Sequence, residues 1–151
     1  MLDLPCGDFG WLSTVPLDLD YTGGDIVAAL VASNEERFGG PGSRRRFLRL
    51  DLTADPLPRA DVVLCRDCLV HLKNRQVVSA LRNFRRSGST YLLATTFGDS
   101  RPNVDGPLGG WRPAHLEGPP FGLGEPLRRI SEAESVEDPR FSDKCLGLWR
   151  L

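Results

Sequence analysis

The sequence predicts a doubly wound α/β fold, with a mostly parallel sheet closed at one edge by a C-terminal antiparallel strand pair. Up to about residue 97, short apolar runs alternate with stretches of helical spacing, which is typical of parallel strands joined by helices. Some of these runs are continuously apolar, as expected for strands buried on both faces. Two further strand-like segments follow with no helical stretch between them, and they predict the antiparallel pair.

Each element has its own local signal. The run Val62-Val63-Leu64 lies at the centre of a buried strand. Val77, Leu81 and Phe84 share one face of a helix that Gly88 ends. The expected strands are residues 2–4, 21–25, 47–51, 60–65, 91–97, 127–130 and 145–151, and the expected helices are residues 9–14, 26–38 and 74–86.

Length and composition limit the kind of protein. With 151 residues, the chain is expected to form a single domain spanning residues 1–151. Lys and Arg number 19 and Asp and Glu number 20, for a net charge of -1, so we expect no nucleic-acid partner. No apolar run is long enough to span a membrane, and no signal peptide is recognisable at the start. The expected location is therefore cytoplasmic, with the four cysteines as free thiols.

Residues 98–126 are rich in Gly and Pro, which excludes a long helix and predicts a loop or lid. Long loops inside a domain often bind substrates. Asn103, Trp111, His115 and Phe121 are candidate acceptor-binding groups; alternatively, the aromatic side chains pack onto the sheet. Trp149 in the last strand is expected to be a packing residue.

Candidate ligand-binding residues follow three successive strands. Gly7 lies in a turn that allows a ligand to approach the backbone. Asp25 ends the second strand, where a carboxylate can accept both hydroxyls of a ribose. Asp51, followed by the apolar Leu52, can accept from the amine of an adenine. Each is also a common turn residue, but their order along the chain predicts a pocket for an adenosine-containing cofactor.

These residues carry a family resemblance. Asp3-Leu4-Pro5-Cys6-Gly7, Tyr21-Thr22-Gly23-Gly24-Asp25-Ile26, Asp51-Leu52 and residues 61–72 resemble the successive motifs of class I S-adenosylmethionine-dependent methyltransferases. The resemblance covers nearly the whole chain and implies a Rossmann-like methyltransferase fold that uses S-adenosylmethionine.

The resemblance also implies roles for particular residues. Asp3 and the turn would face the methionine part of the cofactor, Asp25 would hold the ribose, and residues 65–67 would line the floor below the sulfonium. The implied cofactor-binding residues are Asp3, Pro5, Cys6, Gly7, Asp25, Ile26, Asp51, Leu52, Cys65 and Arg66.

The chain departs from the family pattern in two ways. Three glycines are usual in the first motif, and the corresponding positions here are Pro5, Gly7 and Phe9. The usual upstream helical segment is also missing, since the chain begins almost inside the first strand. We therefore expect a more open pocket, which a second copy or a partner chain could cover.

Asp67 and His71 are the candidate catalytic residues. Methyl transfer is an in-line displacement that needs a general base only when the acceptor must lose a proton. In a continuous helix, Asp67 and His71 would share one face; alternatively, His71 packs against the backbone and Asp67 orders its loop. No metal site is expected from Cys6, Cys65 and Cys68, because zinc requires a fourth ligand.

The predicted function is methyl transfer to an unidentified acceptor, with a small metabolite favoured over a protein. Two alternatives remain open. The chain can be a truncated or non-catalytic cofactor-binding domain that needs a partner. It can also be an NAD-dependent oxidoreductase domain, since Pro5, Gly7, Gly10 and Asp25 approximate the dinucleotide-binding pattern.

Overall fold

The computed structural model describes residues 1–98, 101–107 and 109–151, and it confirms the predicted sheet. Seven strands lie in the order β3-β2-β1-β4-β5-β7-β6. The first five are parallel, and β7 runs antiparallel between β5 and β6. The strands are β1 (Leu2–Asp3), β2 (Tyr21–Asp25), β3 (Arg45–Arg49), β4 (Val62–Cys65), β5 (Tyr91–Phe97), β6 (Arg128–Ser131) and β7 (Lys144–Arg150).

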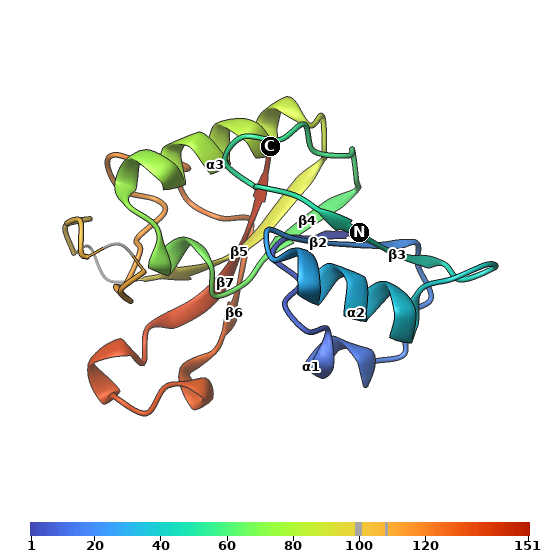
Figure 1. Ribbon diagram of the computed structural model, residues 1–151. Coiled ribbons are helices and arrows are strands. Elements are labelled where there is room, and N and C mark those ends of the chain that lie inside the picture. The colour runs from blue at the N-terminus through green and yellow to red at the C-terminus, as the bar shows by residue number, and fades with distance from the viewer. Residues whose placement is uncertain (99–100, 108) are drawn as a thin grey trace.

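The connections place helices on both faces of the sheet. Helices α1 (Gly10–Ser13) and α2 (Ala28–Phe38) lie on one face, and α3 (Asn74–Arg86) covers the other (Figure 1). The chain moves outward from β1 to β3 and returns to β4 beside β1, so the strand order reverses between β1 and β4. In such sheets the carboxyl ends of the strands at this reversal form the usual ligand site.

The face below α3 holds the larger hydrophobic core. The helix buries a stripe of apolar side chains against the central strands and against residues 114–121 of the long loop. Buried members of this stripe are Val77, Ala80, Leu81 and Phe84. Trp149 of β7 is also buried in this core, as expected, and its Nε1 donates a hydrogen bond to the Gly124 carbonyl oxygen at 2.9 Å.

The opposite face holds a smaller aromatic core centred on Phe9. The Phe9 ring is fully buried, and its centroid lies 4.8 Å from that of Tyr21, 5.1 Å from Phe38 and 5.4 Å from Phe47. Its backbone has a φ of 58°, in the left-handed region that glycine prefers. The ring packing therefore holds a backbone conformation that a side chain ordinarily disfavours.

Two elements next to the ligand edge, β3 and α2, begin two residues away from their predicted starts. At the opposite edge, β4 likewise begins at Val62 rather than at residue 60. Strand β3 covers Arg45–Arg49 rather than residues 47–51, because it pairs in register with Tyr21–Asp25. Helix α2 begins at Ala28 rather than at residue 26. Asp51 and Ile26 therefore lie in loops beyond the regular elements.

The described part of residues 98–126 contains no helix or strand. Asp99, Ser100 and Leu108 lie outside the described residues. Elsewhere in the loop, Ala114 and Leu116 are buried in the core below α3. No helix in the described ranges has the length and apolar character needed to cross a membrane.

Candidate functional site

A cavity of about 320 Å³ opens at the carboxyl edge of the sheet, between the ends of β1, β2 and β3 and the start of α3. It brings together five of the residues that the resemblance assigns to the cofactor: Pro5, Asp25, Ile26, Asp51 and Leu52. Two carboxylates and a group of apolar side chains thus share one hollow, which is the composition expected for a nucleoside pocket.

Six other lining residues are not among those that the resemblance assigns to the cofactor. They come from the strand ends and from the segment that leads into α3: Leu4, Leu50, Thr53, Cys68, Leu72 and Gln76. Leu4, Cys68 and Leu72 lie within the motifs that carry the resemblance. No motif marks Leu50, Thr53 or Gln76, and the fold brings Gln76 at the start of α3 to this edge. Among the predicted cofactor residues, Asp3, Cys6, Gly7, Cys65 and Arg66 do not line this cavity.

Asp25 joins the ends of β1 and β2. It is buried, with 5% of its surface exposed, and its side chain accepts hydrogen bonds from two backbone amides. The Gly7 amide donates to Oδ2 at 3.2 Å, and the Val27 amide donates to Oδ1 at 2.9 Å. The carbonyl oxygen of Gly7 accepts from Nδ2 of the buried Asn34 at 2.7 Å. The turn at Gly7 is therefore fixed against both β2 and α2.

Asp51 is held by the loop that follows β3. Its Oδ1 accepts hydrogen bonds from the Thr53 amide at 2.8 Å and from the Thr53 hydroxyl at 2.6 Å. Both donors contact Oδ1, and the residue lines the cavity. Leu52 lies beside it on the same cavity wall.

Asp3 lies below the turn, outside the cavity. It is 3% exposed, and its Oδ2 accepts a hydrogen bond from the Tyr21 hydroxyl at 2.7 Å. Burial raises the pKa of the Asp3 carboxyl to about 6, although the hydrogen bond from Tyr21 and the charge of Arg66 act in the opposite direction. The carboxylate is thus ionised at neutral pH in a largely desolvated position.

Replacing Asp3 by asparagine is expected to raise the free energy of unfolding near pH 8 by roughly 2–3 kcal/mol. The folded chain holds the Asp3 proton up to about pH 6, whereas the unfolded chain releases it near pH 3.8. The wild type is therefore stabilised by the protonated Asp3 carboxyl at low pH, and this stabilisation is lost as the pH rises from about 4 to 6. Urea denaturation from pH 4 to 8 measures the effect; an Asp3→Asn variant with the same pH slope as the wild type contradicts it.

Cys6, Cys65 and Cys68, the three cysteines near the site, are free thiols. Burial raises the pKa of Cys6 to about 12. A hydrogen bond with Cys68, together with complete burial, raises the pKa of Cys65. Across the described ranges, no group of three or more His, Cys, Asp or Glu residues has the geometry to hold a metal ion.

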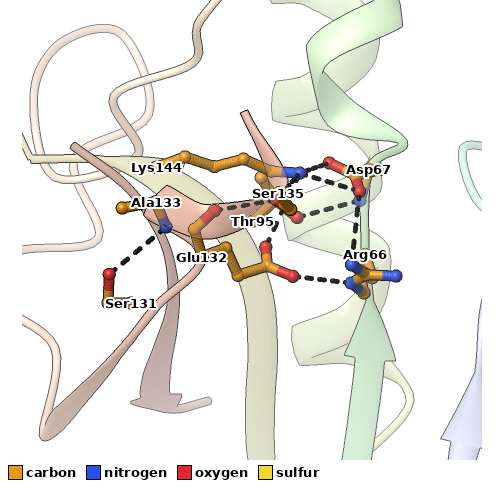
Figure 2. Close-up of polar contacts among 8 residues, drawn as sticks. All are labelled: Arg66, Asp67, Thr95, Ser131, Glu132, Ala133, Ser135 and Lys144. Carbon is orange, nitrogen blue, oxygen red and sulfur yellow. Dashed lines mark hydrogen bonds and ion pairs between the residues drawn. The ribbon is translucent and has the colours of Figure 1, made fainter. Parts of the chain in front are cut away.

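The turn after β4 holds Asp67 in a left-handed conformation, with a φ of 52°. The Asp67 amide donates to the Thr95 hydroxyl at 2.9 Å. The Lys144 ammonium lies 2.8 Å from Oδ1 and 3.0 Å from Oδ2 of Asp67 (Figure 2). Arg66 points to a different partner, with its Nε 2.7 Å from Oε1 of Glu132.

Lys144 and Glu132 were not predicted from the sequence. Lys144 opens β7 and pairs with Phe97, the last residue of β5. Because β7 is antiparallel, its first residue lies at the carboxyl edge of the parallel strands. Lys144 is one of only two lysines in an arginine-rich chain, and that rarity was the one signal that could have drawn attention to it.

The helical geometry that would place Asp67 beside His71 does not form. His71 lies in a 3₁₀ turn (Leu69–His71), whereas Asp67 precedes this turn with a left-handed backbone. The side chain of Asp67 pairs with Lys144, and His71 is exposed. The continuous helix on which a carboxylate–imidazole pair depends is therefore not formed between Asp67 and His71, and the catalytic roles of the two residues stay predictions.

Of the four candidate acceptor-binding residues in the loop of residues 98–126, some pack in the core or order the loop, and others remain accessible. Phe121 is buried in the core below α3, which agrees with the alternative that aromatic side chains pack onto the sheet. Asn103 organises the loop, because its side chain contacts the backbone of His115 and Pro119. His115 lines a second cavity of about 550 Å³, and Trp111 packs against Phe141 while remaining partly exposed.

No family model and no curated protein sequence matches the chain. Its structure is similar to human N-acetylserotonin methyltransferase in complex with S-adenosylmethionine, with a TM-score of 0.67 and 14% identity over 99% of this chain and 46% of that one. Magnesium protoporphyrin IX methyltransferase from Synechocystis with bound S-adenosylmethionine also has a TM-score of 0.67, at 14% identity over 99% of this chain and 68% of that one. The chain has the class I methyltransferase fold.

The strand order agrees with this fold, because the antiparallel β7 between β5 and β6 is typical of methyltransferases. The same fold occurs in the [4+2]-cyclase SpnF, with a TM-score of 0.62 and 19% identity over 88% of this chain and 54% of that one. The chain spans about half the length of N-acetylserotonin methyltransferase and of SpnF. At these identities the methyltransferase fold is established, and the reaction is a separate question.

Proposed function

We propose that the chain binds S-adenosylmethionine at the carboxyl edge of its sheet and transfers the methyl group to a small-molecule acceptor. The observation that carries this proposal is the 320 Å³ cavity, in which Asp25 and Asp51 follow neighbouring strands of a methyltransferase fold. Two structural neighbours contain S-adenosylmethionine, and their names refer to small acceptors.

The residues present fit a nucleoside. Asp25 is fixed by two backbone amides and lines the hollow, which suits an acceptor for the two ribose hydroxyls. Asp51 Oδ2 can accept from the adenine amine, while Ile26 and Leu52 supply apolar contacts to the ring. The methionine part would then extend past Pro5 toward the turn that holds Asp67.

S-adenosylmethionine supplies an activated methyl group on a sulfonium, so the chain mainly has to align the reactants and exclude water. The fixed turn at Gly7 and the fixed turn at Asp67 provide this alignment. The Asp67 side chain is 39% exposed and can accept a hydrogen bond from an incoming hydroxyl or amine.

Isothermal titration with S-adenosylmethionine, S-adenosylhomocysteine and NAD tests this function. We expect both adenosyl ligands to bind at micromolar concentrations and NAD not to bind. Binding of NAD alone would favour the oxidoreductase alternative, although the inserted antiparallel strand departs from the usual dinucleotide-binding strand order. The absence of any binding contradicts the proposal.

A further inference from the structure

The C-terminal antiparallel strands supply two oppositely charged side chains to the turn after β4. Glu132 follows β6 and pairs with Arg66, while Lys144 begins β7 and pairs with Asp67 (Figure 2). Lys144 also lies 3.8 Å from Oε2 of Glu132. The strand pair thus sets the local charge next to the proposed cofactor site.

Lys144 is built into the fold rather than free on the surface. It is 8% exposed, and its backbone is fixed by pairing with β5. Its ammonium contacts both oxygens of Asp67 and lies 3.4 Å from the Ser135 hydroxyl. The backbone amide of Asp67 is fixed by Thr95. The Asp67 carboxylate is therefore held by a buried ammonium, whose charge it shares with the more distant Glu132 carboxylate.

The position of Asp67 makes this counter-charge relevant to methyl transfer. Its neighbour Cys68 lines the proposed cofactor cavity, as does Pro5. On its other side, the charge of Arg66 lowers the pKa of Asp3, which lies below the cavity. The Asp67 carboxylate is thus next to the place where the proposed function puts the sulfonium. The Arg66 Nη2 lies 4.0 Å from Asp67 Oδ2, so Lys144 is the nearer cation.

During methyl transfer the acceptor's lone pair forms the new bond to the methyl carbon. The S–CH₃ bond breaks, and its electron pair stays on sulfur, so the positive sulfonium becomes a neutral thioether. An unbalanced carboxylate beside the sulfonium would stabilise the charged ground state more than the transition state, in which this charge is being lost. Such an interaction slows transfer rather than promoting it.

We propose that Lys144 is a positioning residue for methyl transfer that acts through Asp67, a proposal that rests on the proposed function. It holds the Asp67 carboxylate in place for the acceptor and balances its charge, so that the carboxylate does not trap the sulfonium. The chain then discriminates little between charged S-adenosylmethionine and neutral S-adenosylhomocysteine at this position.

The test compares the dissociation constants of these two ligands at pH 7.5 and low salt, and it requires no knowledge of the acceptor. Replacing Lys144 by methionine should strengthen S-adenosylmethionine binding relative to S-adenosylhomocysteine by about three- to tenfold, because the carboxylate is then unbalanced. Asp67→Asn should move the ratio in the opposite direction. Lys144→Arg, and the double variant of Lys144→Met with Asp67→Asn, should lie near the wild type.

Arg129→Met is the matched control, because it removes one positive charge from β6 where Arg129 pairs with Glu117. It should leave the ratio unchanged. Equal weakening of both ligands by Lys144→Met, or a ratio that neither Lys144→Met nor Asp67→Asn changes, overturns the inference. Failure of the wild type to bind either ligand overturns the proposed function and the inference with it. If Lys144→Met does not fold, Asp67→Asn decides the question, with Lys144→Arg expected to keep the wild-type ratio.

Discussion

Replacing Asp25 by alanine is expected to weaken binding of S-adenosylhomocysteine by about 100-fold or more. The substitution removes a charged acceptor for two ribose hydroxyls, and hydrogen bonds to charged groups contribute roughly 1.5–3 kcal/mol each. It also releases the amides of Gly7 and Val27, which Asp25 holds at 3.2 and 2.9 Å. Loss of ligand contacts and loss of the preformed turn act in the same direction.

Isothermal titration measures this effect, with a thermal melt to show that the variant is folded. Asp61→Ala is the matched control, since Asp61 is an exposed carboxylate just before β4, at the opposite edge of the sheet. It should bind like the wild type. Unchanged affinity in a folded Asp25→Ala variant would remove Asp25 from the ribose site.

Replacing Phe9 by alanine is expected to lower the free energy of unfolding by about 3–5 kcal/mol. The ring is fully buried among Tyr21, Phe38 and Phe47, so its removal leaves a cavity in the smaller core. Phe9→Gly should cost roughly 1 kcal/mol less than Phe9→Ala, because glycine accepts the left-handed backbone at this position without strain.

Urea denaturation measures both Phe9 variants, with Val15→Ala as a control at a partly exposed apolar side chain beyond α1. The control should change stability by less than about 1 kcal/mol. If Phe9→Gly were as stable as the wild type, the ring would contribute little, and the departure from the glycine pattern would have no packing explanation.

The fold was predictable from the sequence because its signals are local and repeated. Continuous apolar runs specify buried strands, and the spacing of Val77, Leu81 and Phe84 specifies the buried face of α3. The boundaries beside the site were not predictable to the residue. Pairing of β3 with β2 sets where β3 begins, and the Asp25 side chain contacts the amide just before α2.

The candidate site was predictable only in part. Asp25 and Asp51 can be placed near the carboxyl edge, because the strand-like runs locate strand ends to within a few residues; Asp25 does end β2, whereas Asp51 lies beyond the end of β3. Lys144 and Glu132 cannot be located in this way, because their place depends on how the last two strands pair with the rest of the sheet. The spacing of apolar residues also does not predict that the Asp67 side chain pairs with Lys144 rather than with His71.

The most direct test of the account is a crystal structure with S-adenosylhomocysteine bound. We expect the ribose hydroxyls within hydrogen-bond distance of the Asp25 carboxylate and the adenine beside Asp51 and Leu52. The sulfur atom should lie near the turn at Asp67. A ligand bound elsewhere, with the cavity between β1, β2 and β3 unoccupied, would contradict the assignment of this edge as the cofactor site.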